Sequence, residues 1–356
     1  MGRNASGIKR FAQHARQENG DRKLAGIDEK IRQYVHDVMN SERPSSLEMA
    51  PLAKGGSDRT FRRIHFGDGR SLIFMHYNPD REENRYYAAV AGFLRELGLT
   101  VPVIFHHDPA KCFVLMEDLG DADLWSFRQS PWEIRRVYYR KVLRMIHKLH
   151  RFPLENPALR SMTLMEGFGP ALYRWERDYF RENFVRNICG LMPDGVEAAS
   201  LEAELDELAG RLQRTGASLI HRDFQSQNIL IHQGEPALID FQGLRIGSYF
   251  YDLGSLLYDP YASLDGPARL ELLRYYFELE EGRTCAWETF QETFHEAAAQ
   301  RLMQALGAYG YLGRQHNRED FLEHIPGGVK RLIEATSLSP RLPLLRNLAD
   351  RCRMVL

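Results

Sequence analysis

The sequence lacks several features that would place it in common protein classes. Its 356 residues include only four cysteines, Cys112, Cys189, Cys285 and Cys352, without paired spacing, so neither a disulfide framework nor a zinc site is expected. No run of about 18 apolar residues occurs, so a membrane-spanning helix and a membrane partner are not expected. The formal net charge is −1, which gives no global basic surface for nucleic acid.

Targeting signals, repeats and the commonest nucleotide motif are also missing. Residues 1–23 are basic but have no apolar core, so they do not form a signal peptide and a cytoplasmic location is expected. No internal repeat or low-complexity tract is present. No G-x-x-x-x-G-K-[ST] motif occurs, which disfavours a P-loop fold. The length allows one large two-lobed unit or two domains.

The most informative stretch runs from Ser218 to Asp259. Within it, the apolar runs Ile229–Ile231 and Ala237–Ile239 flank the segment Gln233-Gly234-Glu235-Pro236. Short apolar runs on either side of a Gly- and Pro-containing segment predict two strands joined by a turn. This stretch is therefore expected to form a β-hairpin.

Polar residues lie just outside the two ends of this hairpin. Asp223 and Asn228 precede the first strand, and Asp240 follows the second. Because an antiparallel pair brings these ends together, the three side chains are expected to converge. Carboxylate and amide oxygens are ligands that suit Mg²⁺, which also keeps phosphate oxygens as partners.

The spacing of these residues indicates phosphoryl transfer. His221-x-Asp223-x-x-x-x-Asn228 is the catalytic-loop pattern of protein-kinase-type enzymes. In those enzymes the Asp accepts the proton of the attacking hydroxyl, and the Asn and a second Asp, here Asp240, hold magnesium. Asp223 is therefore the predicted catalytic residue, and Asn228 and Asp240 are the predicted metal ligands.

Departures from the protein-kinase pattern favour small-molecule kinases. The D-F-G of protein kinases reads Asp240-Phe241-Gln242 here, Phe224 stands where Leu is usual, and no A-P-E-like segment follows. The chain resembles the aminoglycoside phosphotransferase/choline kinase superfamily, and most of all its branch of bacterial anomeric N-acetylmuramate/N-acetylglucosamine kinases of cell-wall recycling. The stretches that carry the closer match are Ile239–Gln242, Gly247, Tyr251–Leu253, Ser255–Leu257, Asp259, Gln300–Tyr309 and Phe321–Pro326.

This resemblance, which covers about residues 47–335, implies a fold and a division of the chain. The fold class is α+β, a bilobal protein-kinase-like fold with a small antiparallel-sheet N-lobe and a larger, mainly helical C-lobe. The expected parts are a basic and helical extension (1–46), a nucleotide-binding N-lobe (47–118) and a catalytic and acceptor-binding C-lobe (119–356). The implied cofactors are ATP and Mg²⁺, and the protein is expected to be a monomer or weak dimer.

The nucleotide site is expected in the N-lobe. Gly55, Gly56 and Ser57 lie in a turn between strands, where backbone N–H groups can approach phosphates because glycine has no Cβ. The third strand, Ser71–His76, lacks the Lys that holds phosphates elsewhere in the superfamily. The candidates for a replacement cation are Lys54, Arg62 and Arg63. By resemblance, the backbone of Glu117, Asp118 and Leu119 pairs with adenine.

The acceptor is expected to bind to the C-lobe. The candidate acceptor-binding residues are Glu176, Gln225, Gln242 and Arg245. Asp252 precedes an apolar helical run, where an Asp is a favourable N-cap. We therefore interpret Asp252 as a helix cap.

The predicted activity is ATP-dependent phosphorylation of an amino-sugar hydroxyl, with the anomeric hydroxyl of N-acetylmuramate or N-acetylglucosamine as the expected site. An aminoglycoside- or choline-type kinase is one alternative, because residues 265–296 contain eight Asp or Glu against three Arg and would attract a cationic acceptor. A pseudokinase, an ATP-binding module with a regulatory role, is an alternative of another class. The missing strand Lys favours it, whereas the intact Asp223, Asn228 and Asp240 argue against it.

Overall fold

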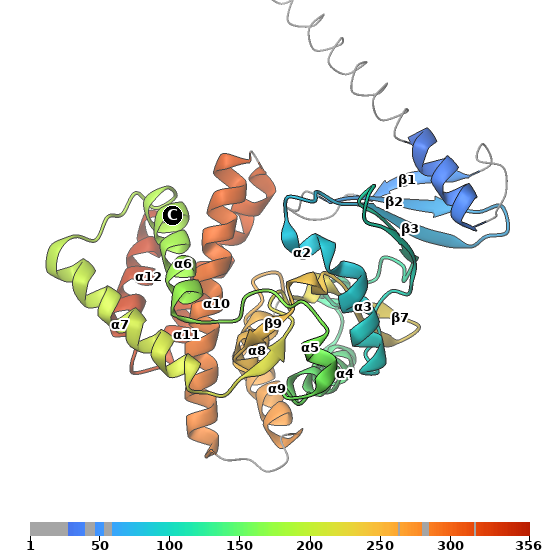
Figure 1. Ribbon diagram of the computed structural model, residues 1–356. Helices are drawn as coiled ribbons and strands as arrows, with labels where there is room; N and C mark the ends of the chain where they lie inside the picture. The colour runs from blue at the N-terminus through green and yellow to red at the C-terminus, as the bar shows by residue number, and fades with distance from the viewer. Residues whose placement is uncertain (1–27, 40–46, 53–58, 263, 280–284, 317) are drawn as a thin grey trace, which may run out of the picture. The chain divides into compact units, whose positions relative to one another are not determined.

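The computed structural model describes residues 28–39, 47–52, 59–262, 264–279, 285–316 and 318–356. These residues form two compact units. The first contains the described residues up to Arg81 together with Val103–Asp118, and the second contains Glu82–Pro102 and Leu119–Leu356. Figure 1 labels many of the strands and helices of both units.

The first unit contains a five-stranded antiparallel sheet with the strand order β1-β2-β3-β5-β4. Its strands are β1 (Glu48–Leu52), β2 (Thr60–His65), β3 (Ser71–His76), β4 (Ile104–Asp108) and β5 (Phe113–Glu117). Ile64 pairs with Leu72, and Phe74 pairs with Leu115. All four of these side chains are buried, because alternate residues of a strand face the same side of a sheet. This confirms the predicted antiparallel N-terminal sheet.

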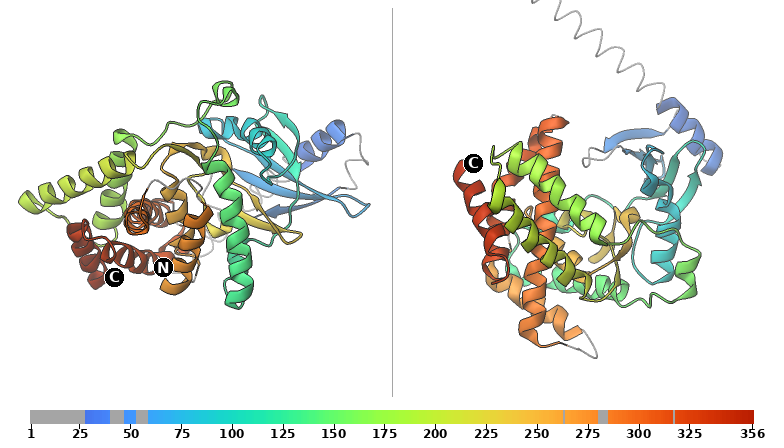
Figure 2. Two further views of the ribbon diagram at one scale, coloured as in Figure 1. Left: turned by 90° about the horizontal axis from the view of Figure 1, so that it is seen from below. Right: turned by 60° about the vertical axis from the view of Figure 1, so that its left-hand side comes forward.

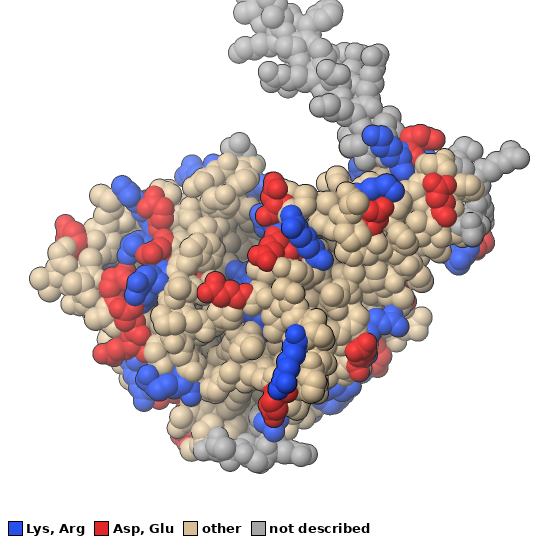
Figure 3. All heavy atoms as spheres, viewed as in Figure 1, with Lys and Arg blue, Asp and Glu red and all other residues tan. Residues whose placement is uncertain are grey.

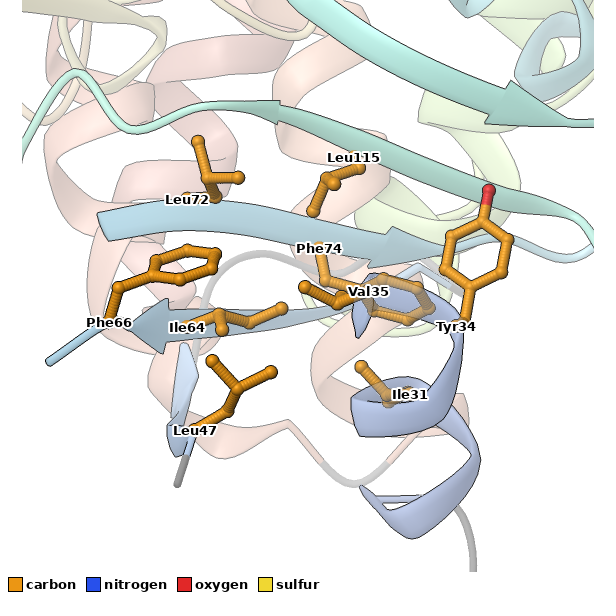
Figure 4. Packing of buried hydrophobic residues seen from close by; sticks show 9 residues of the cluster. All are labelled: Ile31, Tyr34, Val35, Leu47, Ile64, Phe66, Leu72, Phe74 and Leu115. Carbon is orange, nitrogen blue, oxygen red and sulfur yellow. The ribbon is translucent and has the colours of Figure 1, made fainter. Parts of the chain in front are cut away.

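The helix over residues 28–39 packs against this sheet. Figure 4 shows its side chains Ile31, Tyr34 and Val35 facing those of the strands. The shared cluster consists of Ile31, Tyr34, Val35, Leu47, Ile64, Phe66, Leu72, Phe74 and Leu115. Each fully buried large apolar side chain contributes roughly 1.5–3 kcal/mol. The helix and the sheet therefore form one hydrophobic core. The predicted division of the chain at residues 46 and 118 stays a prediction.

The second unit is mainly helical, as predicted. Its longer α-helices are α3 (Tyr87–Glu96), α4 (Trp132–His150), α6 (Pro170–Phe180), α7 (Gly195–Gln213), α8 (Tyr249–Leu257), α9 (Gly266–Leu279), α10 (Trp287–Gln315), α11 (Ile325–Ser337) and α12 (Pro343–Val355). Two short helices are α2 (Glu82–Arg85) and α5 (Pro157–Arg160). Two antiparallel strand pairs join β6 (Ser218–Ile220) to β9 (Arg245–Gly247) and β7 (Ile229–His232) to β8 (Glu235–Leu238).

Small residues let α10 lie close to its neighbours. Figures 1 and 2 show α10, the long orange helix, beside α6, α8 and α11. A Cβ added at Gly254 of α8 would lie 2.8 Å from the Cα of Ala298. One added at Gly310 would lie 2.1 Å from the carbonyl oxygen of Asn183, in the π-helical turn Arg181–Arg186. This close packing lets side chains of α10 reach the loops of the second unit.

Two further observations concern the surface and the helices of the described residues. On the face shown in Figure 3, Lys and Arg are interspersed with Asp and Glu, without a broad area of positive charge. Among the helices of the described residues, none combines the length and the apolar character needed to cross a membrane.

Candidate active site

The predicted hairpin consists of β7 and β8. Ile229 pairs with Leu238 and His232 pairs with Glu235, so the turn contains two residues, Gln233 and Gly234. Both have a positive φ, 51° and 82°, which suits two-residue hairpin turns because it matches the twist of the strands. The predicted four-residue turn is therefore wrong in length, since its last two residues belong to β8.

Hydrogen bonds to the backbone bring the chain segments that carry Asp223, Asn228 and Asp240 together. The side-chain Nδ2 of Asn228 donates to the backbone carbonyl of Asp223 at 2.9 Å. The N–H of Ile239 donates to the carbonyl of Asn228 at 3.0 Å, so the backbone of Asp240, the next residue, lies close to Asn228. A Cβ added at Gly243 would lie 3.9 Å from Oδ2 of Asp223, which places the turn after Asp240 against this carboxylate.

Asn228 and Asp240 supply oxygen atoms of the kind that Mg²⁺ binds. Nδ2 of Asn228 is used as a donor, which fixes the orientation of the amide. Its Oδ1 has no hydrogen-bond donor among the described residues, so this oxygen is available to a cation. Asp240 has a left-handed backbone (φ 61°, ψ 34°), and its Oδ1 accepts a hydrogen bond from Nε2 of Gln242 at 2.8 Å. Mg²⁺ commonly uses one or two carboxylates and completes its shell with waters and phosphates. The residues present therefore fit this ion.

Asp252 holds the backbone of the catalytic loop. Its Oδ2 accepts the N–H of His221 at 2.7 Å, and its Oδ1 accepts the N–H of Arg222 at 2.8 Å. Nε2 of His150 lies 3.1 Å from Oδ2. Arg222 has a φ of 76°, a conformation that is costly for a non-glycine residue, and the two hydrogen bonds to Asp252 stabilise it.

The predicted N-cap role of Asp252 is wrong. The N-cap of α8 is Ser248, and Asp252 lies inside the helix and is fully buried. A buried carboxylate requires hydrogen-bond donors. The sequence signal for this role was a single acid within an apolar helical run, and its partners lie far away in the sequence.

Asp259 fixes the other end of the same loop. Its Oδ2 accepts hydrogen bonds from the N–H and the hydroxyl of Ser226, at 2.8 Å and 2.6 Å. Its Oδ1 accepts the N–H of Tyr261 at 2.9 Å. Burial raises the pKa of the Asp259 carboxyl, while the hydrogen bonds from Ser226 and Tyr261 act in the opposite direction.

Two arginine side chains flank the carboxylate of Asp223. Nη1 of Arg222 lies 3.3 Å from Oδ2, and Nη2 of Arg301, on α10, lies 3.6 Å from Oδ1. Burial raises the pKa of the Asp223 carboxyl, but the charges of Arg222 and then Arg301 outweigh it, and the pKa lies below its ordinary value. Asp223 is therefore ionised at neutral pH, and 30% of its side chain is exposed. Neither arginine was predicted from the sequence.

The sequence of this chain also matches a known protein family. A sequence profile of the Phosphotransferase enzyme family (APH) matches residues 48–310. The chain belongs to this phosphotransferase family. The resemblance stated from the sequence is thereby confirmed, and the protein is a small-molecule kinase of this family.

Individual relatives of this phosphotransferase agree with the assignment. The N-acetylmuramate/N-acetylglucosamine kinase of Pseudomonas aeruginosa is 24% identical over 314 residues, which cover 84% of this chain and 88% of that protein. The structure of choline kinase from Cryptosporidium parvum matches with a TM-score of 0.60 and 12% identity, over 88% of this chain and 98% of that one. The amicoumacin kinase hAmiN, solved with AMP-PNP, Ca²⁺ and Ami, has a TM-score of 0.55 and 16% identity, over 87% and 97% of the two chains. The predicted fold class is confirmed.

Glu176 of the phosphotransferase, a predicted acceptor-binding residue, is fully buried on α6. Its Oε1 accepts the hydroxyl of Tyr251 at 2.8 Å, and its Oε2 accepts Nε2 of Gln300 at 2.9 Å. Burial raises the pKa of the Glu176 carboxyl, against the charge of Arg222 and these hydrogen bonds. Its predicted contact with the acceptor stays a prediction.

The other predicted acceptor residues border the catalytic loop. The N–H of Gln225 donates to the carbonyl of Asp223 at 2.9 Å. Gln242 is 5% exposed and donates to Asp240, while its Oε1 is buried without a partner among the described residues. Arg245, on β9, is also 5% exposed, and its Nε donates to the carbonyl of Gly243 at 3.0 Å.

Two of the candidates for the phosphate-binding cation, Arg62 and Arg63, lie in the described part of the first unit. Met75, in the strand that lacks the expected Lys, is fully buried. Arg63 forms a bidentate pair with Asp118, with N–O distances of 2.7 Å and 3.0 Å. Nε of Arg62 lies 3.3 Å from Asp28. Both arginine candidates therefore have a carboxylate partner within their own unit.

The remaining predicted nucleotide-binding residues are placed as follows. Oε2 of Glu117 accepts the N–H of Val103 at 3.1 Å, and Oδ2 of Asp118 also accepts the hydroxyl of Ser71 at 2.7 Å. Leu119 belongs to the second unit, where its carbonyl lies 3.1 Å from Nδ1 of His232. Lys54, Gly55, Gly56 and Ser57 lie outside the described residues.

Proposed function

We propose that this phosphotransferase transfers the γ-phosphoryl group of ATP to the anomeric hydroxyl of an N-acetylated amino sugar, N-acetylmuramate or N-acetylglucosamine. The observation that carries the proposal is the convergence of Asp223, Asn228 and Asp240 around one hairpin. The relative from Pseudomonas aeruginosa, whose name contains both sugars, supports this choice of acceptor.

In this proposal Asp223 receives the hydroxyl that is phosphorylated. Its carboxylate, ionised because Arg222 and Arg301 offset the cost of burial, accepts a hydrogen bond from that hydroxyl and orients it. A carboxylate with a lowered pKa is a weak base. The transition state of phosphoryl transfer is loose in most descriptions, so the proton need move to Asp223 only as the new O–P bond forms. Positioning and electrostatics then supply most of the rate enhancement.

Asn228 and Asp240 would hold Mg²⁺, which supplies charge neutralisation at the phosphates. Nε2 of Gln242 donates to Asp240 and so fixes the orientation of this carboxylate. ATP and Mg²⁺ are supported by the complex of the related hAmiN with AMP-PNP and Ca²⁺. The adenine contact of Glu117–Leu119 and the phosphate contact of Gly55–Ser57 belong to the same proposal, as do the three-part division of the chain and a cytoplasmic monomer or weak dimer.

The acidic segment 265–296 gives little support to a cationic acceptor. Three of its described carboxylates have arginine partners elsewhere in the second unit: Glu271 lies 2.9 Å from Nη2 of Arg140, Glu296 lies 2.9 Å from Nε of Arg211, and Glu292 lies 3.3 Å from Nε of Arg341. A carboxylate that is paired with an arginine offers little net attraction to a second cation.

Release of ADP with a set of acceptors tests the proposal. N-acetylmuramate and N-acetylglucosamine are expected to support ADP release, and phosphorus NMR of the product is expected to show phosphate coupled to the anomeric proton. The same assay is run with unacetylated glucosamine, choline and kanamycin. Faster turnover of choline or kanamycin than of either N-acetyl sugar would reject the proposed acceptor, and no turnover with any acceptor would favour a pseudokinase.

A further inference from the structure

Three arginine side chains act on the carboxylate of Asp223. Arg222 and Arg301 lie 3.3 Å and 3.6 Å from its two oxygens, so two guanidinium groups share this single carboxylate. The charge of Arg245 also helps to lower the pKa of Asp223. The region around the proposed base therefore contains more positive charge than Asp223 alone balances.

Arg245 is the arginine of this group that lacks a carboxylate partner. It is 5% exposed and donates through Nε to the carbonyl of Gly243, and no Asp or Glu oxygen of the described residues lies within ion-pair distance of it. Burial, and then the charge of Arg222, hold the pKa of Arg245 below its usual value. A nearly buried guanidinium without a counter-ion is unfavourable, so this position is suited to receiving an anion.

Glu176 does not form an ion pair with Arg245. Its two oxygens accept hydrogen bonds from Tyr251 and Gln300, which are both neutral groups. Burial raises the pKa of the Glu176 carboxyl, although the charge of Arg222 and these hydrogen bonds oppose this. Among the described residues, Arg245 therefore stays without a directly paired carboxylate.

Arg245 also lies beside aromatic rings, which are surfaces that suit sugars. Its guanidinium carbon is 6.0 Å from the ring centroid of Phe168. The ring of Phe168 in turn lies 4.6 Å from that of Tyr251 and 5.0 Å from that of Tyr173. Phe168 is half-buried, while both tyrosines are buried. An apolar ring face next to an unpaired cation matches a ligand that has both a sugar ring and a negative charge.

We propose that this enzyme prefers an acceptor that carries a carboxylate, and that Arg245 binds this group while Asp223 receives the hydroxyl that is phosphorylated. The inference rests on the proposed function and narrows its acceptor. N-acetylmuramate has a lactyl carboxylate, which N-acetylglucosamine lacks, so N-acetylmuramate is the sugar that the arginine matches. A planar guanidinium binds a carboxylate through two parallel hydrogen bonds, which gives specificity as well as affinity.

The transferred phosphoryl group is the other anion to be considered for Arg245. The strand β9, which carries Arg245, pairs with β6, whereas Asn228 and Asp240 lie at the ends of the separate pair β7–β8. The proposed metal ligands and Arg245 therefore belong to different strand pairs. If the arginine acted on the phosphoryl group, its loss would slow transfer to charged and neutral acceptors equally.

The first test uses the unaltered enzyme and two acceptors of nearly the same shape, one with an ionised and one with a neutral lactyl group. These are N-acetylmuramate and the same sugar with its lactyl carboxylate converted to the carboxamide. We expect kcat/KM to be at least about tenfold higher for the acid, because a hydrogen bond to a charged group contributes at least that factor. Equal values for the two acceptors would overturn the inference and leave the proposed function intact. Turnover of neither would reject both.

Substitution of Arg245 then assigns the preference to this residue. The ratio of kcat/KM for acid over amide is expected to fall to about one in Arg245→Gln and to an intermediate value in Arg245→Lys, which keeps the charge without the planar fork. Arg346→Gln, at an exposed position of α12, is the matched control and is expected to keep the ratio of the unaltered enzyme. An unchanged ratio in Arg245→Gln, or an equal loss with both acceptors, would overturn the assignment.

Discussion

At the scale of single residues, the catalytic loop depends on buried carboxylates that take no part in the proposed chemistry. Asp252 accepts the backbone N–H groups of His221 and Arg222, and Asp259 accepts two hydrogen bonds from Ser226. These contacts fix the backbone on both sides of Asp223. We therefore expect the activity to be sensitive to substitutions that touch neither the nucleotide nor the acceptor.

Asp252→Asn tests this dependence. The amide replaces one of two acceptor oxygens with a donor, so one backbone N–H of the loop loses its partner in a buried setting. We expect the free energy of unfolding to fall by about 2–4 kcal/mol and kcat to fall at least about tenfold, measured by urea denaturation and by ADP release. The control, Asp350→Asn, alters a half-exposed residue of α12 that, among the described residues, pairs with the exposed Arg353 alone. Equal stability of the two variants would contradict the role of Asp252.

The site residues differ in how far the sequence predicts them. Asp223, Asn228 and Asp240 are close in the sequence, and one hairpin brings them together, so their spacing was enough to predict their convergence. Arg301 reaches Asp223 only because α10 packs closely against its neighbours, and no local pattern reports such a contact. Asp252 was misinterpreted for the same reason, because its partners on the catalytic loop become visible only in the folded chain.

At the scale of elements, the β7–β8 hairpin depends on a turn with two left-handed residues. Gly234 has a φ of 82°, and a Cβ added there would meet nothing within 4 Å. Any effect of adding a methyl group therefore comes from the backbone conformation and not from a clash. The sequence predicted the hairpin from its apolar runs, but it did not show that Glu235 and Pro236 continue the strand.

Two glycine substitutions with opposite expected signs test this view. Gly234→Ala is expected to lower the free energy of unfolding by roughly 1–2 kcal/mol, which is the cost of a left-handed L-residue. Gly92→Ala, at an exposed position of α3 where a Cβ also meets nothing within 4 Å, is expected to raise it by roughly 0.5–1 kcal/mol. Both are measured by urea denaturation. A shift of the same sign in both variants would contradict the conformational explanation.

At the scale of the whole molecule, stability is expected to depend on pH through a buried histidine. His295 of α10 is 5% exposed, and its Nδ1 lies 2.9 Å from the hydroxyl of Tyr258. Burial, and then the charge of Arg269, lower the pKa of His295 from 6.5 to about 4. Between these pH values the unfolded chain binds a proton that the folded chain does not, so the contribution of His295 is complete above pH 6.5 and is lost as the pH falls towards 4.

His295→Gln is expected to flatten this dependence. The shift corresponds to a loss on the order of 3 kcal/mol between neutral pH and pH 4. Asp259 and Glu176, whose pKa values are raised, act in the opposite direction in both proteins and cancel in the comparison. Urea denaturation at a series of pH values measures the difference, with His65→Gln at an exposed position as the control. Parallel curves for the unaltered protein and His295→Gln would contradict the assignment.

The fold as a whole was predicted more completely than its internal contacts. The sequence predicted a third strand over Ser71–His76, where four apolar residues follow one another, and the resemblance supplied the order of sheet and helices. Of the three candidates to replace the missing strand Lys, Arg62 and Arg63 both pair with carboxylates of their own unit, and Lys54 lies outside the described residues. Charge pairing of this kind depends on which side chains the fold places together, and sequence patterns do not report it.

The central claim is that Asp223 receives the hydroxyl that is phosphorylated, and Asp223→Asn tests it most directly. The measurement is acceptor-dependent ADP release with N-acetylmuramate, together with the affinity for ATP as a check that the site is folded. We predict that kcat falls by a factor of about 10²–10⁴, while the Kd for ATP changes by less than about threefold because Asp223 faces the acceptor hydroxyl in this account. Turnover close to that of the unaltered enzyme would contradict it.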